Sequence, residues 1–111
     1  MNNVLEIDGY KAIVTFDPEI DLLRGEFINL NGGADFYASS IEALREEGRR
    51  SLEVFLEMCR EKGVEPKRAY SGRFNLRLDP EVHAAAAVAA AAEHKSLNEW
   101  VADTIEKAAA G

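Results

Sequence analysis

The chain has 111 residues, of which 47% are hydrophobic and 30% charged, and its net charge is −7 at pH 7. This length allows one domain or two very small ones, and no apolar run approaches the roughly 20 residues of a membrane-spanning helix. The N-terminal residues lack the pattern of a signal peptide, and the single cysteine, Cys59, rules out an internal disulfide. We therefore expect a cytoplasmic protein with no membrane partner.

The first half of the chain predicts a small antiparallel sheet. In the stretch from Tyr10 to Asp17 every second residue is apolar or aromatic, and the residues between them are polar except Ile13, which is close to the pattern of a half-buried strand. A second strand is expected at about residues 23–30 and a third at 34–38, separated by the strong turn signal Asn31-Gly32-Gly33. Three strands in a meander leave one face that needs cover.

A long helix is expected to supply that cover. Ser39-Ser40-Ile41-Glu42 is a capping box that opens the helix, which should run to Lys62 and end at Gly63. Its apolar stripe includes Gly48, which would cost roughly 1 kcal/mol relative to alanine in an exposed helix. Close packing against the sheet is the physical reason we expect for this glycine.

The second half of the chain opens with a segment that alternates without a slip, Arg73-Phe74-Asn75-Leu76-Arg77-Leu78. Its polar face carries Arg73, Asn75 and Arg77, whose side chains can grip base edges with paired hydrogen bonds. Its apolar face carries Phe74, Leu76 and Leu78. A helix rather than a hairpin partner follows, so this strand needs a ladder from elsewhere. The ladder could come from the same strand of a second copy, or the strand could join a sheet of its own chain with its arginines merely solvated.

Two helices follow this strand. Asp79 suits the cap and Pro80 the first position of a helix that should run to about Glu93. Ser96-Leu97-Asn98-Glu99 is a capping box for the next helix. That helix shows apolar spacing through Leu97, Trp100, Val101, Thr104, Ile105 and Ala108.

A strand and two helices within about 40 residues make too small a core for a comfortable monomer. As an intertwined dimer the same residues would share one core. Its expected members are Phe74, Leu76, Leu78, Val82, Leu97, Trp100, Val101 and Ile105.

The segment from Ser71 to Ala109 resembles a ribbon-helix-helix DNA-binding domain of the Arc/MetJ type. The resemblance implies that the outward strand residues Arg73, Asn75 and Arg77 read bases in operator DNA. It also implies that the start of the second helix, at Ser96 and Leu97 with Lys95 beside it, holds a backbone phosphate. The runs Tyr70 to Leu78 and Lys95 to Trp100 are closer still to the C-terminal part of the HicB-like antitoxins.

The HicB-like resemblance implies an α+β chain in which a partial RNase H-like domain precedes the ribbon-helix-helix tail. The expected divisions are a partner-binding domain at 1–65, a linker at 66–72 and a DNA-binding and dimerisation domain at 73–111. The implied assembly is a homodimer, and the sequence leaves open whether dimers pair into tetramers on DNA.

The implied function is that of an antitoxin in a HicA/HicB-type toxin–antitoxin system. Such a protein represses its own operon and neutralises a small, basic, mRNA-cleaving toxin of the HicA type. The alternative is a stand-alone ribbon-helix-helix transcription regulator without a toxin. Residues 1–69 carry a net charge of −5, which suits a basic partner, whereas residues 70–111 carry −2 and predict only modest non-specific DNA affinity.

An enzyme is not expected. Carboxylates that could serve a vestigial nuclease are Asp17, Glu19, Asp21, Glu26 and Asp35. Three of them crowd one turn, and nothing in the spacing forces them to converge with the others on a pair of metal ions. His83 and His94 have no cysteine or second histidine at ligand spacing and are taken as surface residues. We therefore predict no catalytic residues, metal or cofactor.

Overall fold

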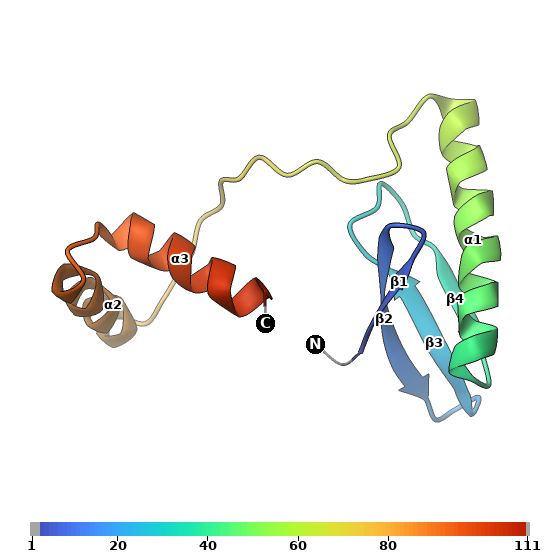
Figure 1. The fold of residues 1–111 in the computed structure, drawn as a ribbon, viewed down its shortest axis with the longest axis horizontal. Coiled ribbons are helices and arrows are strands. Elements are labelled where there is room, and N and C mark those ends of the chain that lie inside the picture. Colours follow the sequence, from blue (N-terminus) through green and yellow to red (C-terminus); the bar gives the residue numbers. More distant parts are fainter. Residues whose placement is uncertain (1–2, 111) are drawn as a thin grey trace. The chain divides into compact units, whose positions relative to one another are not determined.

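The computed structural model describes residues 3–110, which divide between Ser71 and Gly72 into two compact units. The first unit holds a sheet and one helix, and the second holds two helices (Figure 1). The predicted α+β class is confirmed, with four antiparallel strands and three helices among these residues. Within the same range, no helix combines the length and apolar character needed to cross a membrane.

The sheet is an antiparallel meander in the order β1-β2-β3-β4. Its strands are β1 (Val4–Ile7), β2 (Tyr10–Asp17), β3 (Leu22–Phe27) and β4 (Asp35–Ala38). The expected count of three strands is wrong, because it omits β1. This strand pairs with β2 through a two-residue turn at Asp8 and Gly9, whose φ angles of 49° and 84° match the turn that tight hairpins favour.

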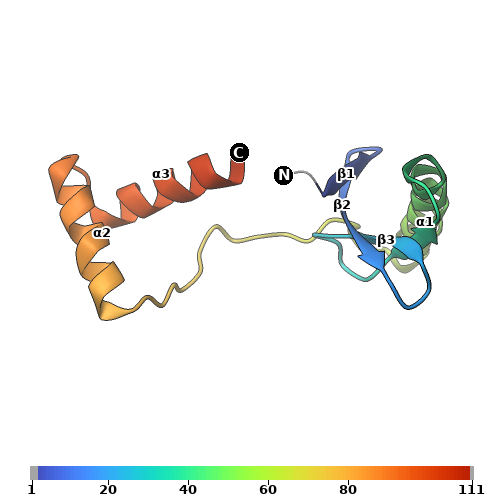
Figure 2. The same cartoon turned by 90° about the horizontal axis from the view of Figure 1, so that it is seen from below.

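One helix, α1 (Ile41–Lys62), covers a single face of this sheet (Figure 2). It ends as predicted at Gly63, which adopts a left-handed φ of 65°. The cap at its start is Ser40, whose hydroxyl accepts a hydrogen bond of 3.1 Å from the backbone N–H of Ala43. The cap therefore lies one residue after Ser39, and because the residue three positions after Ser40 is Ala43, the expected capping box with Glu42 does not form.

The core of the N-terminal unit lies between α1 and the sheet. Its buried members include Leu5, Ile7, Ala12, Phe27, Phe36, Leu44, Leu52, Phe55 and Cys59. The close packing predicted for Gly48 is confirmed. A Cβ atom there would lie 2.4 Å from Cδ1 of Ile7 and 2.9 Å from Cε2 of Phe36, so a methyl group would fit only if Ile7, Phe36 or the helix shifted.

After α1, residues 64–70 return along the chain that follows β3. The backbone N–H of Asn31 donates to the carbonyl of Pro66 at 2.9 Å, and the N–H of Arg68 donates to the carbonyl of Asn29 at 2.8 Å. The Asn31 side-chain amide donates two more bonds to backbone carbonyls of the same segment. Part of the expected linker is therefore tied to the N-terminal unit.

The C-terminal unit packs α2 (Pro80–Ala92) against α3 (Leu97–Ala110). Asp79 occupies the predicted cap position, but its side chain makes no capping hydrogen bond. The residues that α2 buries are Ala86 and Ala90, and α3 buries none completely. This unit consequently holds no large buried side chain between residues 72 and 110.

Candidate nucleic-acid interface

The segment of residues 73–78, predicted as a strand, lies outside every helix and strand (Figure 1). Between residues 72 and 110 the C-terminal unit contains no strand with which this segment could form a ladder. Its apolar side chains are exposed, Phe74 at 73%, Leu76 at 54% and Leu78 at 42%. The interpretation in which it joins a sheet of its own chain is therefore wrong for the single chain.

Leu76 and Leu78 border an apolar groove with a volume of about 480 Å³. The groove runs over both helices, and its other walls come from Val82, Ala85, Ala86, Ala89, Trp100, Val101, Thr104 and Ile105. A wider hollow of about 830 Å³ adjoins it and includes Phe74 and Leu97 in its lining. Every residue of the expected shared core thus borders one of two hollows, and none of these residues is buried in the single chain.

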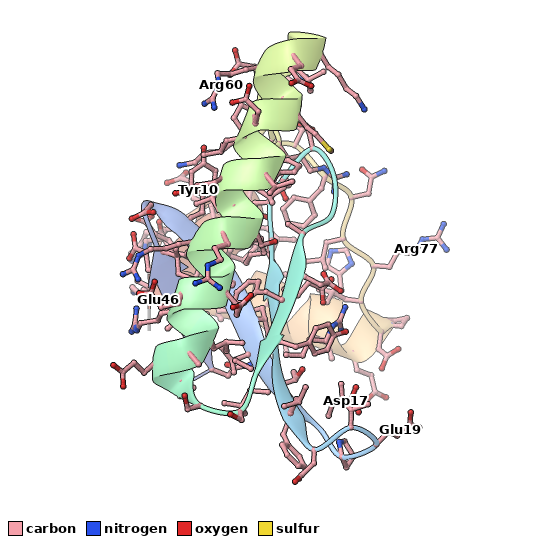
Figure 3. All side chains as sticks on the ribbon, turned by 90° about the vertical axis from the view of Figure 1, so that its right-hand side faces the viewer. Tyr10, Asp17, Glu19, Glu46, Arg60 and Arg77 are labelled. Atoms are coloured by element: carbon pink, nitrogen blue, oxygen red, sulfur yellow. The ribbon has the colours of Figure 1, made fainter. Side chains whose placement is uncertain are left out.

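The residues expected to read bases are also exposed to solvent. Arg73, Asn75 and Arg77 alternate with the apolar residues of the segment, and the Arg77 side chain extends away from the backbone trace (Figure 3). Guanidinium and amide groups on an exposed, extended segment can form paired hydrogen bonds with guanine and adenine edges. The chemistry available here is donor-rich and suits nucleic acid.

The start of α3 has an anion-binding geometry, but its donors differ in part from those expected. The Ser96 hydroxyl accepts the backbone N–H of Glu99 at 3.1 Å, so Ser96 caps the helix as predicted. The Glu99 carboxylate reaches back to the Ser96 hydroxyl, which donates to it at 3.2 Å, rather than to the backbone N–H of Ser96 that a full capping box requires. In the described chain the backbone N–H groups of Leu97 and Asn98 find no acceptor. The Asn98 N–H is not among the donors expected from the sequence, although the start of any helix supplies such N–H groups.

Lys95, expected at the phosphate, is engaged within its own unit. Its Nζ lies 2.7 Å from a carboxylate oxygen of Asp103 and 3.6 Å from one of Glu93. The hydrogen bond with Asp103 raises the pKa of Lys95 and lowers the pKa of Asp103. A phosphate would therefore have to compete with Asp103 for this ammonium group.

The candidate nuclease carboxylates do not form a metal site. Asp17 and Glu19 lie at the turn after β2 (Figure 3). Glu26 and Asp35 face Arg24 instead, at 3.4 Å and 2.5 Å, and the hydrogen bond with Asp35 raises the pKa of Arg24. Among residues 3–110, no three His, Cys, Asp or Glu side chains gather as ligands for a metal ion.

A comparison with known proteins identifies a family resemblance in the second half of the chain. Residues 55–105 match the HicB family, from the last two turns of α1 through most of α3. No curated protein and no solved structure matches the chain. The chain is therefore HicB-like over these residues, a stretch that contains the exposed segment and both grooves.

Proposed function

We propose that the C-terminal unit is one half of a ribbon-helix-helix dimer that binds operator DNA, in a chain that acts as an antitoxin of the HicA/HicB type. The observation that carries the proposal is the exposed segment of residues 73–78, in which polar and apolar residues alternate perfectly and which belongs to no strand of the described chain. Two such segments, antiparallel across a two-fold axis, satisfy each other's backbone groups.

Dimerisation would also bury the apolar side chains that are exposed in the single chain. Phe74, Leu76 and Leu78 of each copy would cover the groove of the other, and each such side chain contributes about 1.5–3 kcal/mol when it moves from water to a core. The buried alanines of α2 support this arrangement, because small side chains let α3 and the ribbon approach closely. A second copy is thus the occupant that fits both the backbone and the groove.

The dimer would present four arginines and two asparagines on one side of a two-stranded ribbon. Such a ribbon fits the major groove, where Arg pairs with guanine and Asn with adenine. The N–H groups at the start of each α3 would hold a backbone phosphate.

Oligomeric state tests the ribbon. We expect the chain to be a dimer in sedimentation equilibrium at micromolar concentration, and Leu76→Asp to be a monomer. Val88→Asp is the matched control, because Val88 is 71% exposed on α2 and borders neither groove. A monomeric wild-type chain would contradict the proposed ribbon-helix-helix dimer.

DNA binding tests the readers. A duplex selected from a random pool by the full-length chain should bind Arg77→Ala about 1–3 kcal/mol more weakly, with relaxed base preference. Arg50→Ala on α1 is the control, because Arg50 pairs only with Glu47 in the other unit. Undiminished binding by an Arg73→Ala, Arg77→Ala double variant would show that the ribbon does not read DNA.

The antitoxin role rests on the HicB-like stretch and on the charge of −5 carried by residues 1–69. We expect the full chain to form a complex with a small basic protein encoded beside it and to stop that protein from cleaving mRNA. The HicB match falls largely on the tail, which a stand-alone transcription regulator would share. Operator binding without a neighbouring toxin gene would therefore favour the regulator.

A further inference from the structure

A small cleft lies at one end of the N-terminal unit, where three separate parts of the chain meet. Its volume is about 330 Å³. The parts are the start of β2, the residues after β3 and the docked segment 64–70. The side chains that matter in it are Tyr10, Lys11, Asn29, Lys67, Arg68 and Tyr70.

The cleft is cationic although its unit is acidic. It is lined by three cations and by no carboxylate, whereas residues 1–69 carry a net charge of −5. Elsewhere in the unit, Arg24, Arg49, Arg50 and Arg60 each pair with a carboxylate. Lys11, Lys67 and Arg68 pair with none in the part of the chain that the structure describes. Their charges are available to an anionic ligand.

The cleft's side chains are held in place before any ligand arrives. The Lys67 ammonium lies 4.8 Å from the centre of the Tyr10 ring and 3.3 Å from the carbonyl oxygen of Gly9. The Arg68 guanidinium lies 5.7 Å from the centre of the Tyr70 ring. These contacts fix each cation with cation–π attraction and leave N–H groups for a further acceptor.

The remaining polar group of the cleft is also oriented. The Tyr70 hydroxyl donates to Oδ1 of Asn29 at 2.6 Å, so the Asn29 amide presents its N–H₂ group as a donor. Ammonium, guanidinium and amide donors converging without an acidic neighbour suit the oxygens of a phosphate.

The number of residues between the cleft and the ribbon limits which phosphates the cleft can reach. Arg68 precedes Arg73, the first ribbon residue, by five positions, and five extended residues span at most about 18 Å. DNA carries a phosphate about every 3.4 Å along each strand. A ribbon bound in the major groove therefore keeps the cleft at high effective concentration near flanking phosphates, whatever the arrangement of the two units.

We propose that this cleft is a second DNA contact, which binds the phosphate backbone of the duplex beside the bases read by the ribbon. The inference rests on the proposed DNA-binding function and extends it to the N-terminal unit. The cleft adds affinity without adding base preference, because phosphates carry no sequence information directly.

The test compares full-length variants on two duplexes. One is the duplex selected from a random pool by the wild-type chain, extended by roughly 10 bp on each side, about one helical turn. The other is trimmed to the bases that the ribbon protects. The variants are K67Q/R68Q, the single change K11Q, and R49Q/R50Q, which removes the same charge from α1 as a matched control. Thermal unfolding checks that each variant is folded, and K11Q alters no contact of the fold.

K67Q/R68Q removes two phosphate contacts from each chain of the dimer, four in all, and should flatten the slope of log affinity against log salt by about 0.9 for each contact. The affinity advantage of the wild-type chain over K67Q/R68Q on the long duplex should then fall roughly a hundredfold between about 50 and about 200 mM salt. K11Q should flatten the slope by about half as much. R49Q/R50Q should match the wild-type chain, and all four proteins should agree on the trimmed duplex.

Equal slopes for K67Q/R68Q, K11Q and the wild-type chain on the long duplex would overturn the cleft while leaving the ribbon intact. A loss for K67Q/R68Q on single-stranded RNA but not on the duplex would overturn it in favour of an RNA site. Failure of the proposed function looks different, because R73A/R77A would then bind the selected duplex as tightly as the wild-type chain does.

Discussion

The two units handle their apolar residues in opposite ways. The N-terminal unit buries Leu44, Leu52 and Phe55 of its helix against a sheet from the same chain. The C-terminal unit exposes Phe74, Leu76 and Leu78 and buries alanines alone between residues 72 and 110. Both units carry enough apolar side chains for a core, but only the first finds its partners within the described chain. In the proposed dimer, the apolar side chains of the second unit form a core only together with a second molecule.

The largest effect should come from the self-sufficient core. Phe36 is buried, its ring centre lies 5.0 Å from that of Phe27, and it meets both Gly25 and Gly48. Phe36→Ala should lower the free energy of unfolding of the N-terminal unit by about 3–5 kcal/mol. Urea unfolding followed by tyrosine signals reports this unit, because Tyr10, Tyr37 and Tyr70 all lie in it. A midpoint that shifts with protein concentration would break the contrast between the units.

Leu78→Ala should produce the opposite behaviour in the tail. The only tryptophan, Trp100, borders the groove beside Leu78, so its fluorescence follows this unit alone. In a dimer core the change should cost about 2–5 kcal/mol per chain, and the midpoint of unfolding should rise with protein concentration. A loss well under 1 kcal/mol, independent of concentration, is what a solvent-exposed leucine gives, and it would mean that no second copy covers the groove.

The contrast also explains why some elements can be predicted from the amino-acid sequence and others cannot. β2 is predicted correctly, because eight alternating residues between turn signals leave little choice. β1 is missed because it has only four residues, although the Asp8-Gly9 turn between β1 and β2 is a signal for a hairpin. The strand pairing of residues 73–78 cannot be seen in the structure of one chain, since the pairing strand belongs to a second molecule in the proposed dimer.

The cleft cannot be predicted from the amino-acid sequence, for a different reason. Tyr10, Asn29 and Tyr70 are far apart in the sequence, and only the docked segment brings them together. No spacing rule connects such positions, because each follows a different element of the fold. The exposed segment, by contrast, carries its pattern in consecutive residues, so the amino-acid sequence alone suffices to name its expected base-reading side chains.

The two helix ends provide a smaller test of the contrast. α1 is followed by Gly63 with a φ of 65°, whereas α2 and its cap Glu93 are followed by His94 with a φ of 57°, a left-handed conformation that side chains resist. His94→Gly should therefore stabilise the tail by about 0.5–1 kcal/mol, after allowance for the freedom of glycine in the unfolded chain. His83→Gly, in the first turn of α2, is the control and should destabilise it by a few tenths of a kcal/mol. Destabilisation by both changes would show that the His94 side chain contributes to the turn.

The smallest expected effect concerns the ion pair that closes the same turn. Lys95 and Asp103 are half-buried, with side chains 31% and 44% exposed, so their pair should contribute only modestly and should weaken with salt. The pKa of Asp103 is held below its ordinary value of 3.8, so the stabilisation is present above pH 3.8 and is lost as the pH falls through the lowered pKa. The pKa of Lys95 is held above 10.5, so the same stabilisation is lost as the pH rises through that raised value. Asp103→Asn should reduce the stability of the tail between these limits and make no difference at lower pH, whereas Glu106→Gln, on the same helix, should leave the profile unchanged. An equal loss at pH 7 and at pH 2 would mean that Asp103 acts through packing rather than through its charge.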